Sequence, residues 1–268
     1  MDHLNAAFAL EPNARAQFAD EGFIHLKQVL DPTVIAAYGP EITRLTMELN
    51  TQHLPMEERS TYDRAFLQVM NLWTQSETVR AFVFGQRLAR IAAELLGVKG
   101  VRLYHDQSLY KEPGGGVTPA HADQHYWPLA SDRVVTAWIP LQPVPLEMGP
   151  LAFWRGSQRV SQGRNLGISD ESEQAIPERM ESLGIPLVEQ PFGLGDVSFH
   201  LGWTFHRAGE NRSQNPRSVM TVIYMDEEMH LKPEWDAIEQ NDADQWCPGV
   251  APGGMARSPL NPVIWSGA

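Results

Sequence analysis

The stretch Val101-Arg-Leu-Tyr-His-Asp-Gln-Ser-Leu-Tyr-Lys111 decides the fold class of this chain. Its odd-numbered residues alternate with its even-numbered ones, which is typical of a β-strand because successive side chains point to opposite faces. Further short runs rich in Val, Ile, Phe and Trp follow between Pro and Gly residues, at 134–141, 151–154, 195–205 and 218–225. Many short strands without helices between successive ones predict an antiparallel sandwich or barrel.

On the N-terminal side of this strand the chain reads mainly as helix. Asp31-Pro32 predicts a helix start, and apolar residues then recur at helical spacing to Leu49. Pro40 should kink or divide that helix. The run Thr74-Gln-Ser-Glu77 matches a capping box and predicts a second helix that ends at Gly97. A short strand is expected at residues 22–26.

On the C-terminal side two segments lack β alternation. Residues 162–190 are polar and predict an insertion or lid between strands. Residues 226–268 are rich in Pro, Gly and Trp, and we expect irregular structure that wraps the barrel. No internal repeat or linker divides the chain. We therefore expect one domain over 1–268, with a helical part at 1–97 and a β core at 98–225.

Composition narrows the class of protein. The 268 residues carry a net charge of −12, which disfavours binding to nucleic acid or anionic membranes through bulk charge. The single cysteine, Cys247, excludes an internal disulfide and a Cys-rich zinc site. The N-terminus has no basic region followed by an apolar run, and no stretch of about 18 apolar residues occurs. We expect a cytoplasmic protein.

The motif His121-Ala-Asp123 carries the chemistry. Residues two apart on a strand point to the same face, so an imidazole and a carboxylate would meet there. They would form part of a 2-His-1-carboxylate set, which holds non-haem Fe(II) and leaves positions open. The alternative is a solvated loop after the glycines at 114–116.

The second histidine must come from another strand, and His200 and His206 are the candidates. They are roughly 20 Å apart along a straight strand, so both cannot join one site unless the chain folds back. Gly202 makes such a bend feasible, and geometry alone leaves the choice open. For either residue the alternative is a hydrogen-bonded core histidine.

Arg217 begins the apolar run that ends at Tyr224. An unpaired arginine is costly to bury, and its planar fork suits a carboxylate. The alternative is a surface arginine at a strand end. If His206 is a metal ligand, the turn at 209–216 would return Arg217 beside it, where it could meet a small dicarboxylate.

Together these residues resemble the phytanoyl-CoA dioxygenase family of Fe(II)/2-oxoglutarate oxygenases, over about residues 15–225. The shared motifs are Phe18-Ala-Asp-Glu-Gly-Phe23, His121-Ala-Asp-Gln-His-Tyr-Trp-Pro128, Thr136-Ala-Trp-Ile139, Met148-Gly-Pro-Leu-Ala-Phe-Trp-Arg-Gly-Ser157 and Gly195-Asp…His206…Asn211…Arg217. Gln158 replaces the family's usual His. The interval of eleven from His206 to Arg217 matches the family and favours His206 over His200.

The resemblance implies a mainly β protein with α additions, built on a double-stranded β-helix (jelly-roll, cupin-like) core with N-terminal helices packed on it. It implies that His121, Asp123 and His206 bind Fe(II). It implies that four further residues meet 2-oxoglutarate, with the distal carboxylate on the first of them: Arg217, Trp138, Gln107 and Gln68. Ala208 stands where some relatives use Ser to contact this co-substrate.

The implied reaction is hydroxylation of a C–H bond of a small-molecule metabolite, with O2 consumed and succinate and CO2 formed. Ascorbate could serve as reductant. The carboxylate of Asp123 favours oxygenation over halogenation, whereas desaturation, epoxidation and cyclisation share the same oxidant. Two other hypotheses are a jelly-roll enzyme that uses Zn or Mn without 2-oxoglutarate, and a non-catalytic ligand-binding barrel. A monomer or homodimer is expected.

Several other residues could surround the site or pack in the core. His125, Tyr126 and Trp127 could line the substrate side or pack in the core. Three residues follow the last core strand and could cap the pocket: Met229, His230 and Trp235. Three aromatic residues are expected in the core: Trp154, Trp203 and Phe205. Three arginines could form a local basic patch for a polyanionic ester: Arg155, Arg159 and Arg164. His105 and Asp106, being adjacent on a strand, should face opposite ways.

Overall fold

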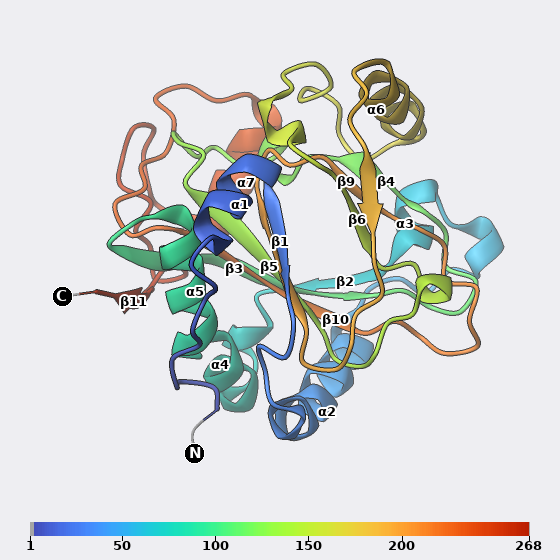
Figure 1. The fold of residues 1–268 in the computed structure, drawn as a ribbon, viewed down its shortest axis with the longest axis horizontal. Coiled ribbons are helices and arrows are strands. Elements are labelled where there is room, and N and C mark those ends of the chain that lie inside the picture. Colours follow the sequence, from blue (N-terminus) through green and yellow to red (C-terminus); the bar gives the residue numbers. More distant parts are fainter. Residues whose placement is uncertain (1–2, 268) are drawn as a thin grey trace.

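Two antiparallel sheets face each other at the centre of the molecule (Figure 1). The computed structural model describes residues 3–267. The larger sheet has the order β1-β8-β5-β10-β3-β11, with β2 also paired to β3, and the smaller has the order β4-β9-β6-β7. The strands are β1 Phe23–Leu26, β2 Leu67–Met70, β3 Gly100–Tyr110, β4 Thr118–His121, β5 Val134–Pro140, β6 Leu151–Trp154, β7 Leu187–Glu189, β8 Val197–Leu201, β9 His206–Ala208, β10 Val219–Asp226 and β11 Val263–Ser266. This is the predicted jelly-roll core with helices added.

Helices cover the outer faces of both sheets (Figure 1). They are α1 Ala14–Glu21, α2 Pro32–Leu49, α3 Thr61–Ala65, α4 Glu77–Val83, α5 Gln86–Leu96, α6 Asp170–Ser182 and α7 Ala237–Trp246. The main apolar core joins α1, α2, α4 and α5 to the large sheet, where Phe18, Ile42 and Phe82 are buried with Val101 and Leu103. Helix α6 packs against β4 of the small sheet.

The predicted start of α2 is confirmed, and its division is not. The Asp31 carboxylate accepts a hydrogen bond from the backbone N–H of Thr33 at 2.8 Å. Pro40 lies inside the helix, which continues from Pro32 to Leu49 without a break. The proline removes one N–H donor, but the buried face of the helix, with Ile42 and Leu45 beyond the proline, packs on the core and holds the helix together.

The capping box predicted at Thr74 is wrong. The Thr74 hydroxyl donates to the carbonyl of Asn71, and the N-cap of α4 is Ser76, which makes no side-chain cap bond. The apolar pattern also runs through two helices, because the chain is extended at Gly85 between α4 and α5. The predicted end at Gly97 is confirmed, since this residue adopts a φ of 67°.

A β-bulge at Tyr104 changes which side chains of β3 face the space between the sheets. Ile223 pairs with His105 and the next residue of β10 pairs with Leu103, so Tyr104 has no partner in β10. Leu103 therefore packs in the helix-covered core, whereas His105 and Gln107 line the pocket. The alternation predicted one face for Leu103, His105 and Gln107, and the bulge shows that this part of the prediction is wrong.

The tail predicted to be irregular contains both a helix and a strand. Helix α7 begins at a capping box. The Asp236 side chain accepts hydrogen bonds from two backbone N–H groups, and the Glu239 side chain accepts one from the backbone N–H of Asp236. Strand β11 pairs with β3 at the edge of the large sheet. The insertion at 162–190 likewise contains α6 and β7. Both helices are short and polar, which masks their period in the sequence.

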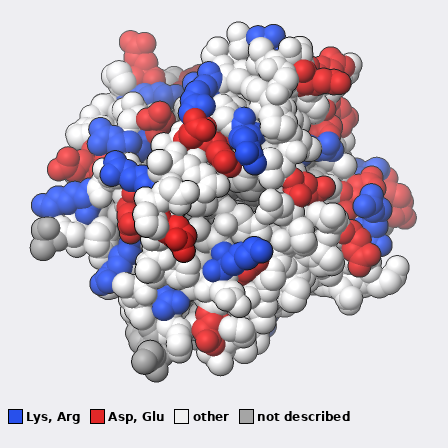
Figure 2. Space-filling view, viewed as in Figure 1, with Lys and Arg blue, Asp and Glu red and all other residues white. Residues whose placement is uncertain are grey.

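The surface has mixed charge. Lys and Arg lie interspersed with Asp and Glu over the face shown in Figure 2. The basic patch considered from the sequence is not formed, because Arg155 pairs with Glu21 at 3.6 Å and Arg159 pairs with Asp20 at 2.8 Å. Within residues 3–267, no helix has the length and apolar character needed to cross a bilayer.

Candidate metal centre and its pocket

Pairing of two short strands brings two histidines together. His121 ends β4, His206 begins β9, and the two residues are opposite each other in the antiparallel register. Their rings lie 4.2 Å apart between centroids. With Asp123 they offer three ligand atoms that all lie within 4.8 Å of one another. The structure therefore brings His121, Asp123 and His206 to one point.

Backbone carbonyls set the tautomer of both imidazoles. His121 Nδ1 lies 2.7 Å from the carbonyl oxygen of Pro119, and His206 Nδ1 lies 2.9 Å from that of Thr204. A carbonyl can only accept, so each Nδ1 carries the proton and each Nε2 keeps its lone pair. The two Nε2 atoms lie 3.5 and 3.6 Å from Asp123 Oδ1.

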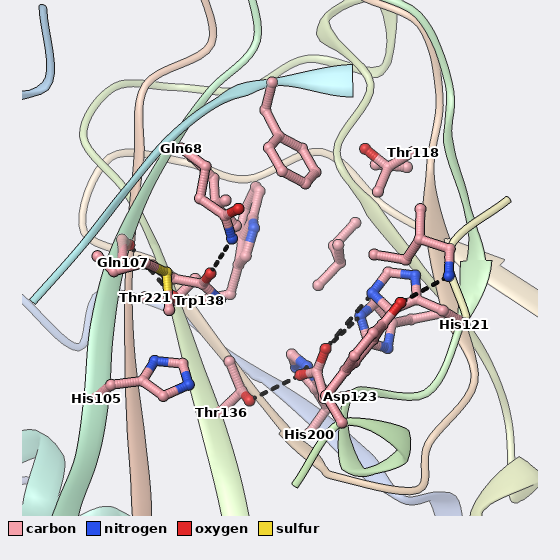
Figure 3. Close-up of a pocket in the computed structure, with 18 of the residues that line it drawn as sticks. Gln68, His105, Gln107, Thr118, His121, Asp123, Thr136, Trp138, His200 and Thr221 are labelled. Carbon is pink, nitrogen blue, oxygen red and sulfur yellow. Dashed lines mark hydrogen bonds and ion pairs between the residues drawn. The ribbon is translucent and has the colours of Figure 1, made fainter. Parts of the chain in front are cut away.

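The second carboxylate oxygen of Asp123, Oδ2, contacts two side chains of the large sheet (Figure 3). The Thr136 hydroxyl donates to Oδ2 at 3.0 Å, and His200 Nε2 lies 3.1 Å from the same atom. Thr136 lies on β5 and His200 on β8, two neighbouring strands of the large sheet. These contacts orient the carboxylate so that Oδ1 faces the two histidines.

The charge states suit a divalent cation. Burial opposes ionisation of Asp123, but the neighbouring imidazoles of His206, His121 and His200 hold its pKa well below the usual value. Burial and the neighbouring His121 hold the pKa of His206 well below its usual value. An ionised carboxylate with two neutral imidazoles is the donor set that non-haem Fe(II) takes, and the residues present fit that ion.

A chain reversal at Gly202 explains how His200 and His206 can both be near Asp123. Strand β8 ends at Leu201 in the large sheet, and β9 begins at His206 in the small sheet. A side chain at Gly202 would place its Cβ 2.7 Å from an oxygen of Gln124, so glycine permits the close approach. The rings of His200 and His206 lie 4.6 Å apart between centroids.

Arg217 lies in the same pocket without a carboxylate partner. Its side chain is 2% exposed, and Nη1 donates to the carbonyl of Gly149 at 2.5 Å. Its Nε has no hydrogen-bond partner, and its Cζ lies 5.5 Å from the Trp138 ring centroid. Burial lowers its pKa to about 10. No acid lies within ion-pair distance of it in the described chain, so a buried positive charge faces the pocket.

The other residues predicted beside Arg217 also line this pocket. Gln68 on β2 donates through Nε2 to Gln107 Oε1 on β3 at 2.6 Å (Figure 3). The indole N–H of Trp138 is buried without a partner. Ala208 is buried against the pocket and offers no hydroxyl there. All four positions singled out with Arg217 are thus brought to one cavity.

The pocket has a volume of about 360 Å³ and extends beyond the metal ligands. Its further wall combines residues of α3, of the segment after Asp123, of the insertion and of α7: Tyr62, Phe66, Tyr126, Trp127, Ile168, Asp242, Gln245 and Trp246. The sequence left both the substrate side and the core open for His125, Tyr126 and Trp127. Tyr126 and Trp127 line the cavity, and His125 does not. The core placement of Trp154 and Phe205 is confirmed, and Trp203 is partly buried under Arg164.

The prediction that Met229, His230 and Trp235 cap the pocket is wrong. Met229 is buried in an apolar cluster, and His230 is exposed. Helix α7 takes that place, with Asp242, Gln245 and Trp246 facing the cavity. Their spacing of three and four residues is a helical signal, and the pattern Asp236-x-x-Glu239 marks the start, so the sequence held a signal for these residues.

Two antiparallel sheets that enclose a 2-His-1-carboxylate set and a buried arginine define a non-haem iron oxygenase. The sequence matches the phytanoyl-CoA dioxygenase (PhyH) family over residues 18–219. The chain belongs to this family and is an Fe/2-oxoglutarate-dependent oxygenase.

Solved structures with the same fold include enzymes of nogalamycin biosynthesis. The carbocyclase SnoK from nogalamycin biosynthesis is 25% identical with a TM-score of 0.77, over 97% of this chain and 100% of SnoK. The epimerase SnoN, solved with Fe3+, alpha ketoglutarate and nogalamycin RO, is 25% identical with a TM-score of 0.78, over 94% of this chain and 98% of SnoN. EctD from S. alaskensis, solved with bound Fe, shares the fold at 19% identity and a TM-score of 0.69, over 97% and 94%. Comparison with the curated proteins finds no match.

Replacing Thr136 with valine should weaken Mn(II) or Fe(II) binding by about tenfold, because Asp123 Oδ2 loses a donor that orients it. Anaerobic calorimetric titration of the metal measures this affinity. Thr221→Val is the matched control, since Thr221 lines the same pocket but donates to the Gln107 carbonyl. Equal metal affinity in both variants would show that Thr136 does not position the ligand.

Proposed function

We propose that this chain hydroxylates a C–H bond of a small-molecule metabolite, with 2-oxoglutarate converted to succinate and CO2. One observation carries the proposal: a buried guanidinium without a counterion, Arg217, faces the same cavity as the three metal-ligand atoms. A dicarboxylate that reaches a metal at one end and arginine at the other satisfies both features.

In this proposal His121, Asp123 and His206 hold the ferrous ion through Nε2, Oδ1 and Nε2. Arg217 binds the distal carboxylate of 2-oxoglutarate with its free Nε–H and the adjacent Nη2. Trp138, Gln107 and Gln68 surround the same molecule. When bound, iron and 2-oxoglutarate activate O2 for oxidation of an unactivated C–H bond.

The chain's own residues position and shield this chemistry. The backbone carbonyls of Pro119 and Thr204 fix both imidazole tautomers, and His200 with Thr136 fixes the carboxylate. Tyr126 and Trp127 line the cavity and offer an aromatic surface for the substrate. The Tyr126 hydroxyl also accepts a hydrogen bond from the Ile168 N–H at 2.7 Å, which holds the insertion over the pocket.

Epimerisation or ring closure is the second candidate outcome of the same oxidation. Its support is the likeness to the epimerase SnoN and the carbocyclase SnoK. The product mass separates the candidates: hydroxylation adds one oxygen, ring closure or desaturation removes two hydrogens, and epimerisation leaves the mass unchanged. The intact carboxylate of Asp123 supports oxygenation over halogenation.

Aerobic incubation with Fe(II), 2-oxoglutarate and a metabolite library tests the proposal. Succinate should form in step with a product that is 16 mass units heavier than its substrate, and ascorbate should sustain turnover. Protein that binds Mn(II) yet neither binds nor consumes 2-oxoglutarate would support the Zn or Mn enzyme instead. Binding of a ligand with no oxidation of any kind would support the non-catalytic barrel.

We propose a cytoplasmic enzyme, since the single cysteine fits a reducing compartment and Cys247 is buried. We also propose a small-molecule substrate and activity as a monomer or homodimer. Sedimentation of the purified chain would report the oligomeric state.

A further inference from the structure

A second acidic side chain lines the pocket away from the metal ligands. Asp242 on α7 is partly buried, and it accepts a hydrogen bond from the Tyr104 hydroxyl. No Lys or Arg of residues 3–267 lies within 4.0 Å of it. Arg217 is the one lysine or arginine among the described residues that line the pocket. Asp242 therefore faces the cavity as a carboxylate without a counterion.

Strand β3 separates Asp242 from the arginine end of the pocket. Tyr104, the partner of Asp242, lies at the bulge of this strand, and Lys111, just past its end, forms an isolated bridge with Arg217. The seven intervening steps span roughly 23 Å at the usual rise per residue. Asp242 consequently lies toward the end of the cavity that is away from Arg217.

Aromatic rings pack around Tyr104 and Trp246, beside Asp242 in the pocket lining. Tyr104 packs edge-on against Trp127 with centroids 5.6 Å apart, and the His105 ring lies 5.3 Å from Trp246. Burial raises the pKa of Asp242 to about 7, against the opposing hydrogen bond from Tyr104. Burial also lowers the pKa of His105 to about 3, so this imidazole supplies no positive charge. A carboxylate beside π faces attracts a cation.

The balance of charges in a pocket that holds Fe(II) and 2-oxoglutarate also favours a cationic substrate. This step rests on the proposed function. The two positive charges of Fe(II) and the one on Arg217 equal the charges of Asp123 and the 2-oxoglutarate dianion. When it is ionised, Asp242 is then the one formal charge left without compensation among the pocket-lining residues described. A cationic substrate would neutralise it, and a substrate carboxylate or phosphate would be repelled.

We propose that Asp242 binds a protonated amine of the substrate, with Trp246 and Trp127 packed around the nitrogen substituents. The substrate class is thus a small metabolite with a basic nitrogen. The amine would anchor the molecule at α7 and leave another part of it near the metal ligands. Asp242 is a specificity-determining residue in this assignment.

Three probes of similar shape test the assignment on the full chain loaded with Mn(II) and 2-oxoglutarate. They are N,N-dimethylbenzylamine, which is protonated at pH 7.5, its uncharged isostere isobutylbenzene, and benzyl alcohol. The amine should bind about tenfold tighter than either neutral probe, as measured by calorimetry and by quenching of tryptophan fluorescence. Equal affinities for the amine and a neutral probe would overturn the proposal.

Two substitutions on the same helix sharpen the test. Asp242→Asn keeps an oxygen for the Tyr104 hydroxyl but removes the charge, and the preference for the amine should disappear. Asp244→Asn removes an exposed charge that accepts from Gln240, and the preference should persist. Asp242→Glu, which keeps the charge, should retain a preference. An unchanged preference in Asp242→Asn of native thermal stability would overturn the proposal.

The failure of this inference and that of the proposed function give different results. A wild-type chain that consumes 2-oxoglutarate but shows no preference for the amine contradicts only the role of Asp242. A chain that prefers the amine in the Mn(II)-loaded state but neither binds nor consumes 2-oxoglutarate contradicts only the proposed oxygenase reaction.

Discussion

Replacing His206 with alanine should abolish stoichiometric Fe(II) binding and lower 2-oxoglutarate turnover by about 1,000-fold. The substitution removes one of the three ligand atoms that converge within 4.8 Å and leaves Asp123 Oδ1 with a single imidazole neighbour. Loss of metal stabilisation worth several kcal/mol corresponds to about three powers of ten in rate. Metal content after anaerobic reconstitution and succinate release measure the two effects.

His200→Ala is the matched control, because His200 is equally buried and contacts the same carboxylate through Oδ2. It supports the ligand without offering an atom to the metal, so the loss of metal affinity should be about 10- to 100-fold. A variant of His200 that loses iron completely, together with a variant of His206 that keeps it, would reverse the assignment of the two histidines.

Local pattern predicted the strands but not the change of face within β3. The alternation from Val101 to Lys111 predicts a strand there, and the structure has β3 over Gly100–Tyr110. The bulge at Tyr104 depends on how Ile223 pairs across the sheet, which is a long-range contact that no short window of sequence contains. The bulge turns His105 and Gln107 toward the pocket and brings Tyr104 to Asp242.

The site was predictable where the spacing of residues in the sequence brings metal-binding or carboxylate-binding side chains together. His121 ends β4, whereas Asp123 lies just beyond the strand, at the start of the 3-10 helix Asp123–His125. The turn after His206 leads to Arg217, which lines the same pocket. The choice between His200 and His206 required the family resemblance, because the reversal at Gly202 that separates their roles is a tertiary feature. Helix α7 was missed because Pro, Gly and polar residues around it resemble loop composition, although Asp236 and Glu239 carried the capping signal.

Replacing Arg217 with methionine should weaken 2-oxoglutarate binding by roughly 100-fold, because the buried carboxylate of the co-substrate would lose its charged partner at a cost of about 3 kcal/mol. Methionine fills similar volume and needs no counterion, so the fold should persist. Arg217→Lys keeps the charge but loses the planar fork and should give an intermediate affinity. Calorimetric titration of 2-oxoglutarate into Mn(II)-loaded protein measures the three dissociation constants.

Arg102→Met separates this effect from the general loss of a buried guanidinium. Arg102 is 9% exposed and also donates to backbone carbonyls, those of Glu227 and Asn261, but it lies outside the pocket. Its removal leaves those carbonyls short of a donor and should lower the melting temperature without changing the affinity for 2-oxoglutarate. If Arg217→Met bound 2-oxoglutarate as tightly as the wild type, Arg217 would not be the residue that binds the co-substrate, and its charge in the wild type would serve some other ligand. If Arg102→Met weakened 2-oxoglutarate binding as much as Arg217→Met, the loss of affinity would follow from the loss of protein stability. Only Arg217 lines the pocket, so only its replacement can remove a direct contact with the dicarboxylate.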